Sequence, residues 1–182
     1  MNHITIIAGA RPNFMKIAPI IHEINKRKLQ NINIDFSLVH TGQHYDKKMS
    51  GDFFDQLNIP EPNINLNAGM GSHAKQTAEI MIRFEKYLIS YPTDLVLVVG
   101  DVTSTMACAI TAQKLKIKVA HIEAGIRSND WSMPEEINRL VTDSITNFFF
   151  TTSEQANYNL INSGVSKKRI YYVGNTMIDT LL

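Results

Sequence analysis

The stretch DLVLVVGDVTST, residues 94–105, joins five successive aliphatic residues to a glycine, an acid and a run with three hydroxyl side chains. A short, continuous aliphatic run is typical of a strand buried on both faces of a sheet. Gly100 and Asp101 end that run, and the hydroxyl groups at positions 103–105 are suited to cap a helix. The stretch therefore predicts a buried strand, a turn and the start of a helix.

The same alternation of strand and helix patterns extends along the whole chain. Five further short apolar or alternating runs, rich in Ile, Val and Phe, lie at residues 3–8, 32–40, 118–122, 148–151 and 170–173. Most are separated by stretches with helix-length apolar periodicity. Parallel strands joined by crossover helices fit this order, so the sequence predicts an α/β protein with a doubly wound parallel sheet. Residues 59–72, rich in Pro, Asn and Gly, predict ordered turns or a mobile flap.

Length, charge and cysteine content narrow the class of protein. A chain of 182 residues with a formal net charge of +1 fits one globular domain. Its Lys and Arg residues are dispersed, which argues against a nucleic-acid or anionic-membrane partner. Cys108 is the only cysteine, so neither an intrachain disulfide nor a thiolate zinc site can form. The N-terminal apolar run is too short for a signal peptide or a membrane span, and we expect a cytoplasmic protein.

The C-terminal residues suggest that the protein has a second part. Residues 1–174 fit one α/β domain with the predicted parallel sheet, and Asn175 or Thr176 can cap a helix that follows it. That helix pattern stops at Leu182 without a C-cap. We therefore expect residues 175–182 to begin the connection to a further domain.

Candidate site residues directly follow the predicted strands, where ligands of open α/β sheets bind. After the first strand, Gly9 precedes Arg11, and Lys16 follows in the same predicted helix. Two cations at the positive end of a helix are unfavourable unless an anion neutralises them. They can bind a phosphate or carboxylate, or pair with acids elsewhere in the crevice. The pattern G-x-G-x-x-G of dinucleotide-binding proteins is missing here.

Acids follow two later strands and start one later helix. Asp101 is either a site carboxylate or a turn residue, and Glu123 follows the strand at 118–122. Glu135 lies with Glu136 and Arg139 in a segment whose charges are also ordinary helix stabilisers. His121 is more typical of a core histidine than of a base. Acids and cations gathered at one sheet edge are costly unless a ligand or reaction uses them.

Five motifs in collinear order give the chain a family resemblance. They are GARPxxxK at 9–16, TGQHYD at 41–46, GDVTST at 100–105, HIEAGIRS at 121–128 and MPEEINR at 133–139. Together they resemble the non-hydrolysing UDP-N-acetylglucosamine 2-epimerases over about the first half of that family's length. The resemblance implies a two-domain, glycosyltransferase-B-like architecture, of which this chain is the N-terminal Rossmann-like domain. The second domain supplies most contacts to UDP, so the chain alone is expected to be inactive. Family members are commonly dimers.

The family interconverts UDP-GlcNAc and UDP-ManNAc, which supplies ManNAc-type sugars for surface polysaccharides. UDP is eliminated to leave a glycal and is added back after a proton returns to carbon 2 on the opposite face. By resemblance, Asp101, Glu123 and Glu135 are catalytic, with the acid and the base among them unassigned. Arg11 and Lys16 match cations near the diphosphate and sugar. Arg127 and Arg139 either contact substrate or hold Glu123 and Glu135 in place. Neither a cofactor nor a metal is implied.

One further pair of residues concerns regulation. Gln43 and His44 match a loop that binds a second UDP-GlcNAc as an activator in some bacterial members. That loop continues as YDKKM here, where those members resemble REML. The same segment resembles relatives that act on UDP-2,3-diacetamido uronic acids.

Three other functions stay open. A glycosyltransferase of the same architecture would transfer sugar to an acceptor without exchange at carbon 2. A non-catalytic domain would bind the nucleotide sugar without turnover. A hydrolysing epimerase would release free ManNAc, although those enzymes resemble GSRAEY where this chain reads ARPNFMK at 10–16.

Overall fold

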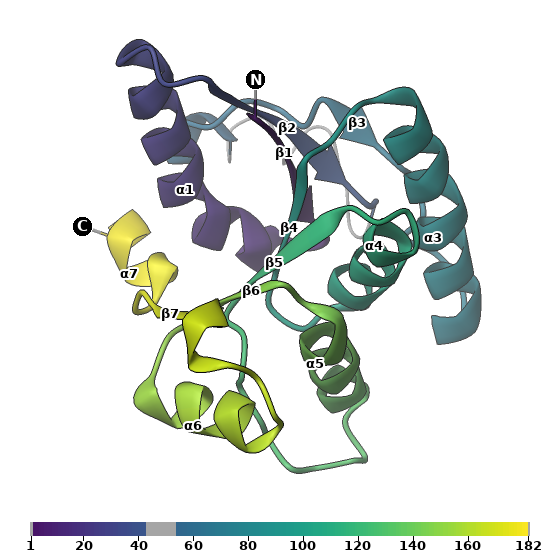
Figure 1. Ribbon diagram of the computed structural model, residues 1–182. Helices are drawn as coiled ribbons and strands as arrows, with labels where there is room; N and C mark the ends of the chain where they lie inside the picture. The colour runs from purple at the N-terminus through teal and green to yellow at the C-terminus, as the bar shows by residue number, and fades with distance from the viewer. Residues whose placement is uncertain (1, 43–53, 182) are drawn as a thin grey trace.

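The computed structural model describes residues 2–42 and 54–181, which form a three-layer α/β fold (Figure 1). Seven parallel strands within these residues make one sheet in the order β3-β2-β1-β4-β5-β6-β7. The strands are β1 Asn2–Ala8, β2 Ile34–His40, β3 Ile64–Asn65, β4 Leu95–Val99, β5 Lys118–Ile122, β6 Phe148–Thr151 and β7 Ile170–Tyr172. The predicted class, a doubly wound parallel sheet, is confirmed.

Helices cover both faces of the sheet. They are α1 Arg11–Leu29, α3 His73–Ser90, α4 Thr103–Lys114, α5 Pro134–Ile145, α6 Glu154–Asn162 and α7 Thr176–Leu181, with a 3₁₀ turn η1 at Lys167–Arg169. The apolar side of α1 packs on one face, where Ile17 and Ile21 are fully buried. The opposite face carries α3 and α4, and Phe84 of α3 is fully buried in that core. Figure 1 shows α1 and α7 on one side of the sheet and α3, α4 and α5 on the other.

One predicted loop contains a strand. Within residues 59–72, Ile64 and Asn65 pair in parallel with Val39 and His40, so the prediction of turns alone was wrong there. The side chain of Asn63 accepts a hydrogen bond from Leu38 N at 2.7 Å, which fixes this segment to the sheet edge. A two-residue strand leaves no apolar run in the sequence that could predict it.

The start of α4 also differs from the prediction. Its N-cap residue is Val102, and no side chain caps the helix. Instead, the Ser104 and Thr41 hydroxyls are 2.6 Å apart, and Thr105 donates to the carbonyl of Val99 at 2.8 Å. The hydroxyl groups therefore join α4 to the ends of β2 and β4.

Two other helices begin where the sequence analysis expects them. Pro134 is the first residue of α5, and Asn175 accepts a hydrogen bond from Met177 N at 3.0 Å at the start of α7. The Thr180 hydroxyl then donates to the Met15 carbonyl at 2.6 Å, so α7 lies against α1. Among the described residues, no helix is long and apolar enough to cross a membrane.

Candidate active site

The site lies where the strand order changes direction. From β1 the chain proceeds through α1 to β2, whereas from β4 it proceeds through α4 to β5 on the other side. The two connections leave the sheet in opposite directions, which opens a crevice at the carboxyl ends of β1 and β4. The predicted residues after β1, β4 and β5 therefore meet at one edge.

An ion pair between Lys16 and Glu123 occupies this edge. The Lys16 Nζ atom lies 2.5 Å from Oε2 of Glu123, and both side chains are largely buried. A Cβ atom on Gly100 would come within 3.5 Å of Lys16 Nζ and 3.6 Å of Glu123 Oε2. Gly100 has φ +68°, a conformation that favours glycine. Gly100, directly after β4, thus forms the floor beneath the ion pair.

Glu123 itself has an unusual backbone conformation. Its φ is 69°, in the left-handed region that residues with a side chain rarely adopt. Such strain costs of order 1–3 kcal/mol and tends to occur at functional sites. The carboxylate is therefore placed beside Lys16 at a cost to the stability of the turn.

Asn13 closes the turn between β1 and α1. Its Oδ1 atom accepts from Gly9 N at 3.1 Å and from Ala10 N at 2.9 Å. Its amide nitrogen donates to the Val99 carbonyl at 3.4 Å. Sequence analysis missed this residue, although an asparagine at the third position of a helix that follows a strand is a recognisable signal. Asn13 fixes the helix that carries Arg11, which is exposed, and Lys16.

A second ion-pair cluster surrounds Asp101. Arg139 donates from Nη2 and Nε to the same Asp101 oxygen, at 2.5 and 3.0 Å. Asn138 donates to the Asp101 carbonyl at 2.8 Å. Arg139 also donates to Glu136 at 2.9 Å. It pairs with these two acids and not with Glu135, so the alternative that Arg139 holds Glu135 was wrong.

Glu136 is the buried member of the acid pair at the start of α5. Only 2% of the residue is exposed, and it accepts bonds from Ser128 N, Ser128 Oγ and Asn129 N. Burial alone would raise the pKa of Glu136, but the hydrogen bonds from Ser128, Arg139 and Asn129 together lower it to about 2. Sequence analysis gave this acid only the role of a helix stabiliser, whereas in the structure it anchors the loop after β5 to α5.

Glu135 is oriented differently from its neighbour. It is half-buried, and within residues 2–42 and 54–181 its carboxylate has neither a hydrogen bond nor an ion pair. It lies in the first turn of α5, where the helix dipole favours a negative charge. Its carboxylate is thus available to a ligand.

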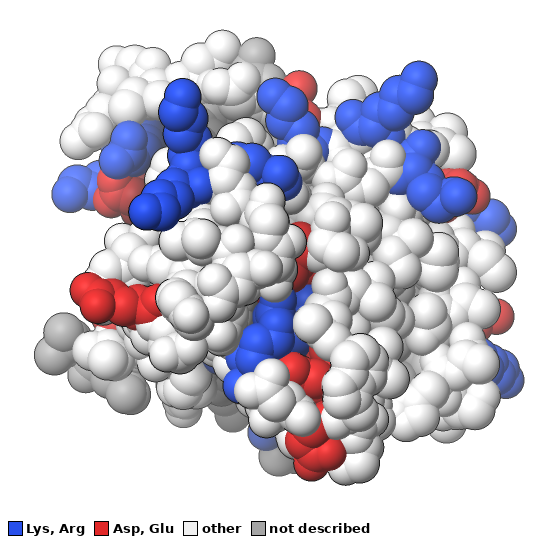
Figure 2. Space-filling model, turned by 60° about the horizontal axis from the view of Figure 1, so that its bottom comes forward, with Lys and Arg blue, Asp and Glu red and all other residues white. Residues whose placement is uncertain are grey.

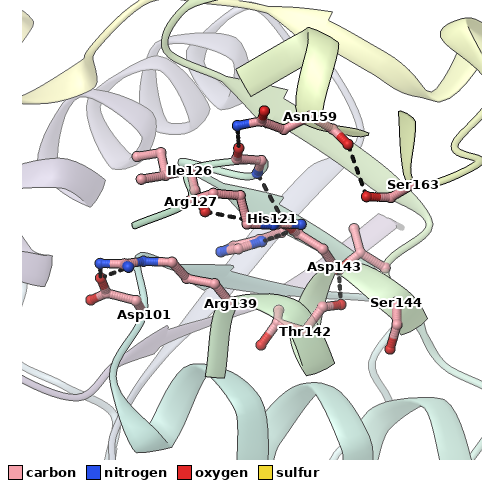
Figure 3. A network of polar contacts seen from close by, with 12 residues as sticks. Asp101, His121, Ile126, Arg127, Arg139, Thr142, Asp143, Ser144, Asn159 and Ser163 are labelled. Carbon is pink, nitrogen blue, oxygen red and sulfur yellow. Dashed lines mark hydrogen bonds and ion pairs between the residues drawn. The ribbon is translucent and has the colours of Figure 1, made fainter. Parts of the chain in front are cut away.

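Arg127 belongs to a third cluster. It pairs with Asp143 at 2.6 Å rather than with Glu123, so the alternative that Arg127 holds Glu123 was wrong (Figure 3). His121 is a satisfied core histidine, as predicted, since its two ring nitrogens bond to Asp143 and to Gly100 O. Figure 2 shows positive and negative side chains side by side in the lower middle of this face, with further positive side chains along its upper part. Gln43 and His44 lie outside the described residues.

Comparisons with known proteins identify the relatives of this chain. The family description "UDP-N-acetylglucosamine 2-epimerase" matches residues 27–182. A "UDP-N-acetylglucosamine 2-epimerase homolog" of Methanococcus maripaludis is 51% identical over 179 residues, 98% of this chain and 48% of that protein. The UDP-2,3-diacetamido-2,3-dideoxy-D-glucuronate 2-epimerase of Pseudomonas aeruginosa is 40% identical over 184 residues, 100% of this chain and 51% of that protein.

Solved structures give the same result. The crystal structure of Methanocaldococcus jannaschii UDP-GlcNAc 2-epimerase in complex with UDP-GlcNAc and UDP matches with a TM-score of 0.89 and 46% identity. The match covers 98% of this chain and 48% of that one. The chain spans about half the length of the curated relatives it matches. The collinear motifs, the sheet order and the match over residues 27–182 agree: the chain belongs to the UDP-N-acetylglucosamine 2-epimerase family.

Proposed function

We propose that the complete protein interconverts UDP-GlcNAc and UDP-ManNAc. The Lys16–Glu123 ion pair carries this proposal: it lies at the crevice between β1 and β4, against Gly100, the residue before Asp101. A base removes the proton at carbon 2 while UDP leaves carbon 1, which gives a glycal. UDP then adds back to carbon 1, and an acid returns a proton to the other face of carbon 2. This chemistry needs positioned carboxylates on the sugar and cations near the departing diphosphate.

The site residues divide into two proposed roles. Asp101, Glu123 and Glu135 transfer protons, and their protonation states are coupled because they share one site. Arg11 and Lys16 stabilise the negative charge of UDP as it leaves. The ion pairs of Arg127 and Arg139 support a role in holding the site together, through Asp143 for Arg127 and through Asp101 for Arg139.

The second half of the protein completes the site in this proposal. We infer that a C-terminal domain closes over the carboxyl edge and supplies most contacts to UDP, and that the complete protein forms a homodimer in the cytoplasm. The relatives that match this chain are about twice its length, which supports the first part. The 182 residues alone are then inactive, and they serve as a control below.

A different sugar is the second candidate. The Pseudomonas aeruginosa relative is 40% identical across the whole chain and is named for a UDP-2,3-diacetamido uronic acid. A substrate of this kind carries an extra carboxylate, and Arg11 is an exposed cation at the same edge.

Proton exchange at carbon 2 tests the proposal. The complete protein is incubated with UDP-GlcNAc in deuterated water, and the sugar protons are followed by NMR. We expect UDP-ManNAc that carries deuterium at carbon 2, and no reaction with the 182 residues alone. Free ManNAc would indicate a hydrolysing enzyme, and binding without exchange would indicate a non-catalytic domain. Exchange only with the diacetamido uronic acid nucleotide would favour the second candidate.

Replacing Lys16 should weaken substrate binding. In Lys16→Ala, the diphosphate loses one charged hydrogen-bond partner, and we expect the Kd for UDP to rise about tenfold or more. Isothermal titration of the complete protein with UDP measures this change. Lys75→Ala, a change to an exposed lysine of α3, is the control and should leave the Kd unchanged. An unaltered affinity in Lys16→Ala would remove Lys16 from the diphosphate site.

Chelation should leave the reaction unaffected. The proposed scheme uses Arg11 and Lys16 for charge stabilisation and assigns no step to a metal ion. We therefore expect the same rate of UDP-ManNAc formation after dialysis against EDTA. A loss of activity that Mg²⁺ or Mn²⁺ restores would contradict this assignment.

A further inference from the structure

A buried carboxylate beneath the site gathers three hydrogen-bond donors. Asp143, in the interior of α5, is 4% exposed. Its Oδ1 atom lies 2.7 Å from Nδ1 of His121, and its Oδ2 atom accepts from Gly125 N at 3.1 Å and from Arg127 at 2.6 Å. Figure 3 shows Asp143 at the centre of this network. The donors come from β5 and from the loop that follows it.

His121 extends the network to the end of β4. Its Nε2 atom donates to the carbonyl of Gly100 at 2.8 Å. Gly100 precedes Asp101 and forms the floor beneath the Lys16–Glu123 pair. The orientation of this peptide therefore depends on the ring of His121, and the ring in turn is held by Asp143.

Gly125 fixes the other side of the network. Its N–H bonds to Asp143, and its carbonyl accepts from Asn159 at 2.9 Å. It has φ +80°, and a Cβ atom there would lie 2.4 Å from the carbonyl oxygen of Ala156. The turn from Glu123 to Gly125 is thus held on both sides, which supports the strained backbone of Glu123.

The hydrogen-bond partners also define the direction of each bond. A carbonyl oxygen and a carboxylate oxygen accept, so the ring of His121 donates to Gly100 and to Asp143. Burial alone would raise the pKa of Asp143, but the hydrogen bonds and charges of His121 and Arg127 lower it. Asp143 is therefore the common acceptor of a ring N–H, a backbone N–H and a guanidinium.

We propose that Asp143 is a positioning residue, which holds the two segments that carry Asp101 and Glu123 through His121 and Gly125. This inference rests on the proposed function. Among the described residues, Asp143 contacts none of the three predicted catalytic acids, so its effect must pass through the groups that it binds. A small shift of reacting groups is enough to reduce turnover substantially.

Two substitutions of Asp143 separate positioning from charge. Asp143→Ala removes the three bonds that this carboxylate accepts, and we expect kcat of the complete protein to fall roughly 100-fold while KM for UDP-GlcNAc stays nearly unchanged. Asp143→Asn keeps the hydrogen bonds, because its amide can donate to a neutral imidazole and its oxygen can accept from Gly125 and Arg127. We therefore expect Asp143→Asn to recover most of the lost turnover. Ser144→Ala, at the next, exposed residue of α5, is the control.

A third variant tests the tether to Gly100. In His121→Asn the amide nitrogen can replace Nδ1 and still donate to Asp143, but the side chain is too short to reach the Gly100 carbonyl. We expect a fall in kcat similar to that of Asp143→Ala. This variant keeps the inference testable if Asp143→Ala does not fold. The ¹⁵N spectrum of His121 should show a proton on Nδ1 in the wild type and none on Nδ1 in Asp143→Asn, whose amide donates to that nitrogen.

The outcomes distinguish this inference from the proposed function. The rate is divided by the concentration of sites that bind UDP to give a normalised kcat. A change in the fraction of folded protein alone does not alter this value. Unchanged normalised kcat in Asp143→Ala or in His121→Asn would overturn the positioning role, as would an Nδ1 of His121 that carries no proton in the wild type. A wild type without epimerisation would contradict the proposed function instead, and the ¹⁵N spectrum would still test the network.

Discussion

Glu123→Gln in the complete protein is expected to lower kcat for epimerisation by roughly 10²–10⁴-fold, the contribution typical of a positioned general acid or base. Glutamine has nearly the same shape, but it can neither take up nor release the proton at carbon 2. The carboxylate lies 2.5 Å from Lys16, on a residue whose φ of 69° fixes it at the crevice. The loss should therefore appear in kcat more than in the affinity for UDP.

The matched control for this variant is Glu79→Gln. Glu79 also forms an ion pair with a basic residue, Arg83, at 2.9 Å, but this pair is exposed on α3. Exposed pairs contribute little, so we expect turnover and stability to stay close to those of the wild type. Rates are measured by NMR from the growth of the UDP-ManNAc signals. Near-normal turnover in Glu123→Gln would remove Glu123 from the reaction.

The sequence predicts the positions of the site residues better than their partners. Asp101 and Glu123 could be placed at one edge because the carboxyl ends of parallel strands meet there. The partner of each residue depends on contacts between distant segments. Lys16 and Glu123 are 107 residues apart, and no local pattern distinguishes their pairing from two solvated charges. The same limit explains why β3 was missed. Its two residues pair with β2, and the preceding residue, Asn63, accepts a hydrogen bond from Leu38 of β2.

The adjacent acids at the start of α5 illustrate the same limit. Glu135 and Glu136 are equivalent as first-turn acids, and side chains of successive helical residues point about 100° apart. Only the packing of α5 decides which of them is buried. Asp143 is a similar case, because it lies between Thr142 and Ser144 in a polar stretch that resembles a solvated face. Its burial follows from the contact of α5 with β5, which the sequence alone does not reveal.

Glu136→Gln is expected to destabilise the 182-residue chain by about 3 kcal/mol at neutral pH. The carboxylate accepts four bonds, from Ser128 N, Ser128 Oγ, Asn129 N and Arg139. An amide can accept with its oxygen only, and its NH₂ group then faces one or more of these four donors. Urea unfolding, followed by the fluorescence of Trp131, measures the change. Trp131 is the only tryptophan, and it lies in the loop that Glu136 anchors.

The pH dependence gives this prediction a second test. The folded state lowers the pKa of Glu136 from 4.5 to about 2, so its stabilisation is fully present above pH 4.5 and is lost as the pH falls toward 2. The difference in unfolding free energy between wild type and Glu136→Gln should therefore shrink over that interval. Asp130→Asn, at an exposed residue of the same loop, should show little difference from the wild type at neutral pH. A Glu136→Gln difference that stays constant from pH 7 to pH 3 would contradict the ionised, four-bonded carboxylate that holds this loop against α5.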